Sequence, residues 1–314
     1  MNPVLPEAAA EFGATATRAF AAIGGVEAAC RAERAPEHRH TEVAGTLRAL
    51  GVDDLDPRQD GDSLAAAAAL CEAAGRVVLP YPVPAVLLRG DDRLPFAVVP
   101  DDRCRVDHGT LFDEWRVATF DGRAGIASPG GRALGSRLGP FVADLVLDRD
   151  LEEPAGTDAR LHLALTAWQV LGTAARAVEL AVDHVSDRVQ FGKPLSAFQA
   201  VQFQLADAAV AVAGLRELAH FTVWRLAVEP TGATADVLAL RVHALDVARA
   251  VLRTCQQLYG AAGVCDEYDI SVLARHVQPA LRLPWGAERT AAALAAAISE
   301  DGFEGLFAHG RAAR

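Results

Sequence analysis

The chain has 314 residues, of which 51% are hydrophobic and 23% charged, a composition typical of a globular protein with more than one structural layer. Its 30 basic and 41 acidic residues give a formal net charge of −11. This balance argues against a surface dedicated to nucleic acid or to an anionic membrane, because both require a basic footprint.

The cysteines and the N-terminus point to a reducing compartment. The five cysteines are odd in number, and no pair has CxxC spacing, so we expect neither a disulfide framework nor a metal site. The first residues lack a basic region followed by an apolar core, and charges interrupt the alanine-rich runs before they reach the length of a membrane span. We therefore predict a cytoplasmic protein without a membrane span.

Residues 1–90 are predicted to form an N-terminal helical domain. Residues 10–25 contain helix formers and end on a glycine pair, which predicts a helix stop. Residues 63–79 are also rich in helix formers, and Ser63 is the expected N-cap. The proline-rich stretch at 80–84 lacks backbone donors and cannot continue a helix.

Residues 91–150 change to the pattern of a small β domain. Short apolar or alternating runs occur at 95–99, 116–120, 124–127 and 141–147. Turn signals at 121–122 (Asp-Gly) and 129–131 (Pro-Gly-Gly) separate some of these runs.

Residues 151–314 are predicted to form a C-terminal four-helix bundle. Apolar residues recur at helical spacing over 161–182, 201–215 and 237–258, and again in a shorter run over 288–298. The fold class is therefore mainly α with a reduced middle β domain.

The first segment that packing explains poorly runs from Arg188 to Gln199, between two predicted helices. Gly192 and Pro194 break the helix, and Ser196 is a candidate N-cap for the next one. An arginine offers a planar fork of donors to phosphate oxygens, and a helix N-terminus adds unpaired N–H groups. The alternative is an ordinary corner between helices with a surface arginine.

The second such segment follows the third bundle helix and includes Gln257 and Gly260. A glycine lets the backbone approach a ligand closely, and a glutamine side chain can both donate and accept hydrogen bonds. The alternative is a glycine-containing helix C-cap.

Together the two segments resemble the C-terminal domain of the acyl-CoA dehydrogenase family. The sequence reads Arg-x-x-Phe-Gly-Lys-Pro-Leu, then Phe-Gln, then Gln-Leu-Tyr-Gly and Glu-Tyr-Asp about 60 residues later, and the resemblance covers roughly Asp158 to Arg275. It implies a tetramer with FAD at its subunit interfaces. The residues it assigns to a neighbouring subunit's FAD are Arg188, Phe191, Gln199, Gln257, Leu258, Tyr259, Gly260 and Ala261; Ala261 replaces the family's second glycine.

The family's own flavin-ring loop and catalytic base are not found. No Thr-Glu-Pro-x-x-Gly-Ser-Asp-like loop occurs between residues 90 and 150, and Pro284 or Trp285 occupies the usual position of the base. The family's alternative base position corresponds to Ala159, and the neighbouring Asp158 would point about 100° away around a helix. The resemblance therefore leaves the catalytic residue unknown.

We interpret the chain as the non-catalytic subunit of a heteromeric, FAD-dependent acyl-CoA dehydrogenase, for example one acting on a steroid side chain. A full-length partner subunit would supply the base and the flavin-ring loop, and the substrate would be an acyl-CoA. Two alternatives remain open. One is a self-sufficient homo-oligomeric flavin oxidoreductase with an atypical base, and the other is a flavin-free oligomerisation scaffold.

Overall fold

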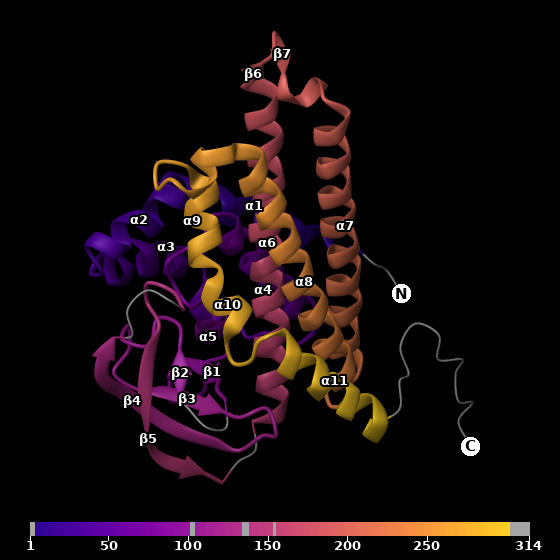
Figure 1. Cartoon of the computed structure of the whole chain (residues 1–314). Coiled ribbons are helices and arrows are strands. Elements are labelled where there is room, and N and C mark those ends of the chain that lie inside the picture. The colour runs from indigo at the N-terminus through magenta and orange to yellow at the C-terminus, as the bar shows by residue number, and fades with distance from the viewer. Residues whose placement is uncertain (1–3, 101–103, 134–137, 153–154, 302–314) are drawn as a thin grey trace.

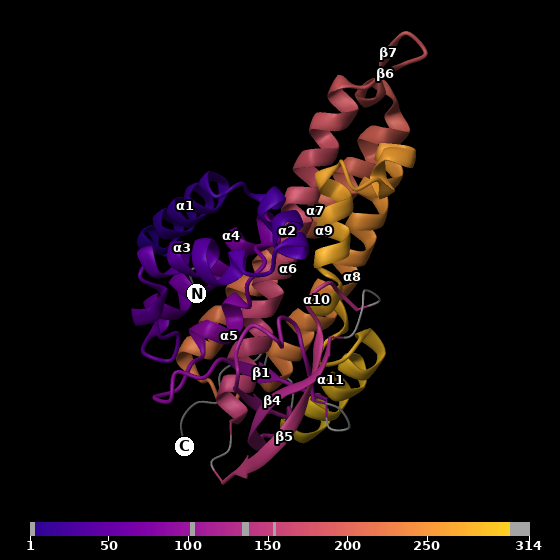
Figure 2. The same ribbon diagram turned by 90° about the vertical axis from the view of Figure 1, so that its left-hand side faces the viewer.

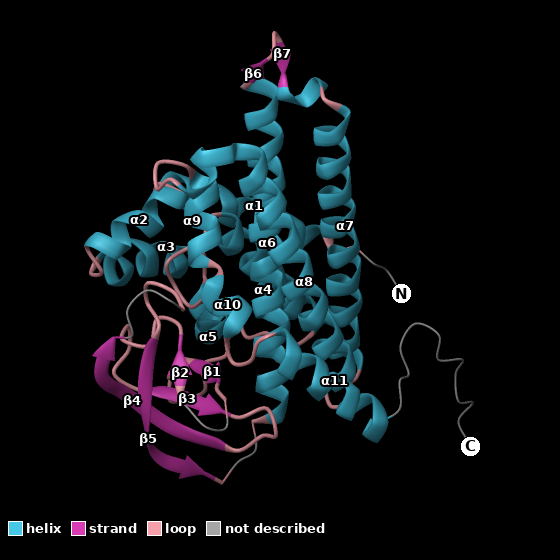
Figure 3. Cartoon of the chain, in the orientation of Figure 1, coloured by secondary structure: helices cyan, strands magenta, loops and turns pink. Residues whose placement is uncertain are grey.

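The structure, a computed structural model, describes residues 4–100, 104–133, 138–152 and 155–301. N-terminal helices are followed by a small sheet and then by a long helical bundle, which confirms the predicted mainly α fold class (Figures 1 and 3). No helix of the described part is long and apolar enough to cross a membrane. The three-domain division of the sequence stays a prediction, because one apolar core runs through the N-terminal helices, part of the sheet and the bundle.

The N-terminal part contains the helices α1 (Glu7–Ala22), α2 (Val26–Arg34), α3 (Ala44–Ala49), α4 (Gly61–Arg76) and α5 (Val83–Leu87). Gly24 and Gly25 follow α1 with positive φ angles of 105° and 57°, as expected for a glycine pair that ends a helix. The prediction that Ser63 caps α4 is wrong. The carboxylate of Asp60 is the cap, and it accepts a 2.7 Å hydrogen bond from the Ser63 backbone N–H.

The sheet has the strand order β1-β3-β4-β5-β2, with β1 (Phe96–Val98), β2 (Arg105–Val106), β3 (Trp115–Ala118), β4 (Ala124–Ala133) and β5 (Ala143–Leu151). Only β1 and β3 run parallel among the described pairs. Gly122, with φ 94°, turns the chain between β3 and β4 as predicted. The prediction of a second turn at residues 129–131 is wrong, because these residues lie inside β4. The register of the β4–β5 pairing shifts between Pro129 and Ala133.

The bundle is formed by α6 (Gly156–Asp187), α7 (Gln199–Val228), α8 (Thr234–Tyr259) and α11 (Ala287–Asp301), with α9 (Asp269–His276) and α10 (Gln278–Arg282) beside it. A hairpin of β6 (Val189–Gln190) and β7 (Lys193–Pro194) joins α6 to α7 and stands clear of the rest of the molecule (Figures 1 and 2). Ser196 lies in a 3-10 turn, Leu195–Ala197, so it does not cap α7 as predicted; Phe198 precedes that helix.

Two glycines allow α4 of the N-terminal part to pack closely against α6 of the bundle. A Cβ added to Gly75 of α4 would lie 1.9 Å from the carbonyl oxygen of Gln169, and one added to Gly172 of α6 would lie 2.0 Å from that of Glu72. The two backbones are therefore nearly in contact, and the Thr173 hydroxyl donates a 2.8 Å hydrogen bond to the Gly75 carbonyl across this contact. Only glycine fits at either position without moving a helix.

We expect Gly172→Ala to lower the free energy of unfolding by about 3 kcal/mol, because the methyl group must push α4 and α6 apart. Urea unfolding measures this loss. Gly45→Ala in α3 is the control, since its Cβ would meet nothing within 4 Å. The control should be neutral or stabilising by up to about 1 kcal/mol. Equal effects at both positions would contradict the close helix contact.

Candidate functional site

The ends of α6 and α8 are tied together at the upper end of the bundle. The Tyr259 hydroxyl donates a 2.9 Å hydrogen bond to the Leu180 carbonyl, and its ring stacks on the His184 imidazole at a centroid distance of 3.9 Å. Arg188 follows one turn after His184 as the C-cap of α6. The structure therefore brings the two sequence segments to the same end of the bundle, although about 60 residues separate them in sequence.

The hairpin between α6 and α7 presents an aromatic ring to solvent. Gln190 pairs with Lys193, and the two turn residues, Phe191 and Gly192, both have positive φ angles, of 53° and 78°. The Phe191 side chain is 89% exposed, and its only described ring contact is with Phe198 at 6.2 Å. A bulky residue at positive φ that buries little of its ring in its own chain suggests an external contact.

Three polar side chains of this region point to solvent. Arg188, Gln199 and Gln257 are exposed, and none of the three side chains has a hydrogen bond or ion pair within the described residues. Arg188 lies at the end of α6, Gln199 is the first residue of the 30-residue helix α7, and Gln257 lies in the last turn of α8. They offer a guanidinium, a helix N-terminus and an amide to an incoming ligand.

At the end of α8 a ligand has room to approach the backbone closely. Gly260, with φ 63°, ends the helix, and a Cβ built on it would meet nothing within 4 Å. Leu258 and Tyr259 are half-buried in the bundle, whereas Ala261 is exposed in the following 3-10 turn. This donor set fits the oxygen-rich diphosphate of FAD, and Gln257 and Gly260 line an open cleft whose other side is formed by residues of α9 and α10.

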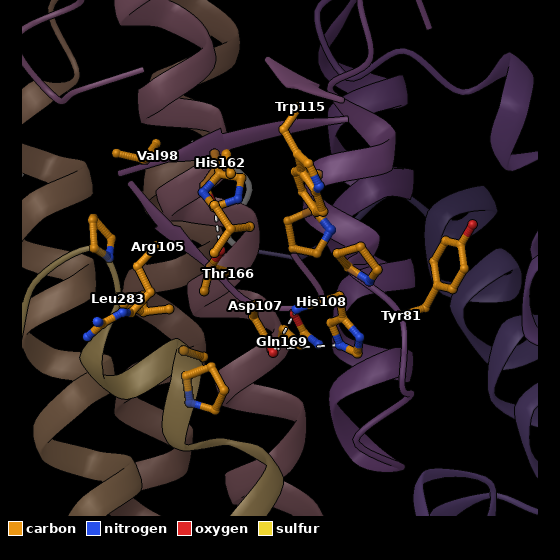
Figure 4. A pocket seen from close by; sticks show the side chains of 18 residues that line it. Tyr81, Val98, Arg105, Asp107, His108, Trp115, His162, Thr166, Gln169 and Leu283 are labelled. Carbon is orange, nitrogen blue, oxygen red and sulfur yellow. Dashed lines mark hydrogen bonds and ion pairs between the residues drawn. The ribbon is translucent and has the colours of Figure 1, made fainter. Parts of the chain in front are cut away.

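The position where the resemblance places a base lies at a different site, beside a small cavity between the sheet and α6. His162, Thr166 and Gln169 project from α6 toward this cavity, and Asp107 and His108 approach from the residues after β2 (Figure 4). Pro284 lines the same cavity. Its free volume is about 80 Å³, well below the roughly 300 Å³ of the smallest usual ligand pockets.

The imidazoles around this cavity are held neutral by their surroundings. Burial lowers the pKa of His162 to about 3, and its Nδ1 has no hydrogen-bond partner in the described structure. Burial first, and then the charges of Arg39 and His276, lower the pKa of His108 well below its usual range. The Arg39 guanidinium lies 3.2 Å from His108 Nδ1. A cavity with neutral imidazoles and little space does not suit a flavin ring.

Asp107 is the titratable residue of this cavity that sequence reasoning missed. Burial raises the pKa of its carboxyl group, while the His108 backbone N–H and the Arg39 charge oppose that rise. A carboxylate with a raised pKa in a cavity is a candidate general base. No sequence pattern pointed to Asp107, because the two-residue strand β2 that positions it is too short to show an alternation of apolar and polar residues.

Asp158 has a structural role. Its carboxylate accepts hydrogen bonds from Nε of Arg58 at 2.7 Å and from Nη2 of Arg58 at 3.2 Å, and Arg116 of β3 donates to the same carboxylate. Its side chain is only 9% exposed, and the neighbouring Ala159 is fully buried. The carboxylate of Asp158 is thus committed to two guanidinium groups, and the alternative base position itself is occupied by the buried Ala159.

We expect Asp158→Asn to lower the free energy of unfolding by about 3 kcal/mol, because it leaves two partly buried guanidinium groups without their anion. The measurement is the urea midpoint and slope. Asp121→Asn is the matched control: Asp121 also pairs with an arginine, Arg123, but its side chain is 60% exposed. The control should change stability by less than about 1 kcal/mol. A loss at Asp158 no larger than the control's would refute its structural role.

Residues 160–296 match the family model described as the acyl-CoA dehydrogenase, C-terminal domain. A short-chain-specific acyl-CoA dehydrogenase from Megasphaera elsdenii is 36% identical over 114 residues, which cover 36% of this chain and 29% of that protein. The segments shared with the first three curated relatives span 29% to 48% of those relatives' own lengths.

Solved structures resemble nearly the whole chain. The ChsE4-ChsE5 complex from Mycobacterium tuberculosis contains a chain that superposes with a TM-score of 0.78 at 17% identity, over 96% of this chain and 99% of that one. A steroid acyl-CoA dehydrogenase, Tcur3481-Tcur3483, also gives a TM-score of 0.78, at 22% identity, over 95% and 99% of the two chains. At these identities the likeness shows that the fold is shared.

Proposed function

Because the chain belongs to the acyl-CoA dehydrogenase family, with residues 160–296 as its C-terminal domain, we propose that it is the non-catalytic subunit of a heteromeric, FAD-dependent acyl-CoA dehydrogenase. Its part in the reaction, the α,β-desaturation of an acyl-CoA thioester, is to hold FAD from one side at a subunit interface. A partner subunit contributes the flavin-ring loop and the base.

The observation that carries this proposal is the contrast between the two ends of the molecule. At the upper end of the bundle, Arg188, Gln199 and Gln257 are exposed and have no partner within the described residues. At the lower end, Pro284 or Trp285 stands where the resemblance places the base, and Pro284 lines a cavity of about 80 Å³. A chain that exposes donors for a neighbour's cofactor, but has no carboxylate at the base position and only a small cavity beside it, fits a supporting role.

The similar structures are consistent with this role. The ChsE4-ChsE5 complex is named for two proteins. The steroid acyl-CoA dehydrogenase Tcur3481-Tcur3483 also carries two protein names. Each aligned neighbour chain is covered to 99%, so this chain has the length of those subunits. We therefore propose that this protein also works in a two-protein assembly. We propose as its substrate a bulky acyl-CoA, such as one with a steroid side chain.

In such an assembly this chain's residues position the cofactor. Bound FAD supplies the acceptor for the hydride from the β-carbon. The Arg188 guanidinium would pair with a phosphate of the diphosphate, and the amides of Gln199 and Gln257 would donate hydrogen bonds beside it. The exposed Phe191 ring would pack against the neighbouring subunit near the cofactor, which buries an apolar surface that is otherwise in water.

The visible absorption spectrum of the chain tests the proposal, measured alone and after co-expression with a genomic-neighbour dehydrogenase. We expect a flavin band only in the co-purified complex, at about half a flavin per chain. A full flavin on the chain alone that an acyl-CoA bleaches would refute the supporting role. Asp107→Asn would then show whether Asp107 is the base. The absence of flavin from both samples would favour the alternative of a flavin-free oligomerisation scaffold.

We expect Arg188→Gln to weaken FAD retention by the complex about tenfold or more, because a charge-assisted phosphate contact is lost. The flavin-to-protein absorbance ratio after gel filtration measures this. Arg18→Gln, which removes an exposed arginine from α1, is the charge-matched control and should leave the ratio unchanged. An unchanged ratio in the Arg188 variant would show that this arginine does not hold the cofactor.

A further inference from the structure

The cleft at the end of α8 owes part of its shape to segments outside that helix. Its free volume is about 610 Å³. Gly260 and Val264 line it from the 3-10 turn that follows α8, and Ala274 lines it from α9. The turn and α9 must therefore keep a fixed position relative to α8 if the cleft is to keep its form.

Arg275 links the turn and α9 from behind the cleft. It follows Ala274 in α9, lies outside the lining of the cleft and donates a hydrogen bond to the carboxylate of Asp266, in the loop after the turn. The same guanidinium donates from Nε to Oε1 of Glu33 on α2 at 3.1 Å, and its Nη2 lies 3.0 Å from that oxygen. Because a guanidinium is planar and rigid, pairing with two carboxylates fixes its orientation and theirs.

Glu33 is the point at which the N-terminal helices hold the end of α9. Its Oε1 also lies 2.6 Å from Nε2 of His276, whose side chain is only 4% exposed. The hydrogen bond with His276, followed by the charges of His276 and Arg275, holds the pKa of the Glu33 carboxyl below its usual range, although burial opposes this. The ring of Phe141, which precedes β5, contacts His276 as well, at a centroid distance of 5.8 Å. Contacts from α2 and from the sheet therefore restrain the end of α9.

We propose that Glu33 is a positioning residue for the cofactor. Through Arg275 and His276 it holds α9 and the turn after α8 in the arrangement in which the cleft accepts FAD. This role rests on the proposed function, in which Gln257 and Gly260 contact the cofactor. No described residue of α2 lines the cleft, so an N-terminal helix would set the affinity for FAD without touching it. The effect arises because a wall that spends part of its time out of position lowers the apparent affinity by that fraction.

The affinity of the co-purified complex for FAD, titrated by flavin fluorescence after the bound flavin has been removed, tests the role of Glu33. We expect Glu33→Gln to weaken binding about fivefold, because an uncharged amide holds Arg275 and His276 less firmly. Glu33→Asp keeps the carboxylate and should bind FAD more tightly than Glu33→Gln. Glu27→Gln is the matched control. Glu27 lies on the same helix and also pairs with an arginine, Arg34, but its side chain is 59% exposed, so the affinity should stay unchanged.

A second variant tests whether Glu33 acts through Arg275. Arg275→Gln removes the contacts to both Glu33 and Asp266, so we expect it to weaken FAD binding at least as much as Glu33→Gln does. The double variant should bind FAD no more weakly than Arg275→Gln alone, because both changes remove the same contact. Fully additive losses would show that Glu33 does not act through Arg275, and would overturn the proposed linkage.

Amide hydrogen exchange of the chain without its partner separates a positioning role from a general loss of stability. We expect Glu33→Gln to speed exchange over residues 260–276 and to leave residues 161–175 of α6 as they are in the unaltered chain. Faster exchange in both segments, with an unchanged affinity of the complex for FAD, would mean that Glu33 only stabilises the fold and would overturn its positioning role.

The flavin content of the complex keeps this role distinct from the proposed function. A complex that loses FAD in the Arg188→Gln variant but binds it normally in the Glu33→Gln variant would refute the role of Glu33 and leave the proposed function intact. An unaltered complex that binds no flavin would refute the proposed function, and the role of Glu33 with it.

Discussion

The carboxylate of Asp158 connects three parts of the molecule that are remote in sequence. It lies in the first turn of α6, where a helix N-terminus favours negative charge, and it pairs with Arg58 before α4 and with Arg116 on β3. Arg58 also donates to the Leu88 carbonyl after α5 at 2.7 Å. These contacts fix the sheet and the N-terminal segment against the start of the longest helix. The narrow cavity between sheet and bundle follows from that arrangement.

The same contact bears on the two positions where the resemblance places a base. At the start of α6 the alternative base position is the buried Ala159, next to Asp158 with its two arginine partners, and Pro284 or Trp285 stands at the usual position. Both positions serve packing. Arg188 and Gln257, which we propose to face the cofactor, are exposed outside this packed region, so either can be replaced without altering the core.

Much of the fold could be predicted because long helices leave long apolar periodicities, as in α6, α7 and α8. Short elements could not: β2 has two residues, α10 has five, and tertiary contacts fix both. The cap of α4 is Asp60 and not Ser63, since several polar residues precede that helix, and before α7 a short 3-10 turn takes up Ser196. Linear motifs predicted Arg188 and Gln257 as site candidates. Asp107 emerged only when the chain was folded, because its neighbours come from distant segments.

The projecting hairpin has a consequence for the protein's life in the cell. Phe191 at its tip, and Phe203 and Val210 along α7, expose apolar side chains on the same projecting end of the bundle. Exposed apolar surface of this kind is what chaperones and proteases recognise on incomplete assemblies. In the proposed assembly, the lifetime of this chain would therefore depend on how promptly a partner covers that surface, so matched rates of synthesis of the two chains would matter as much as the stability of the fold.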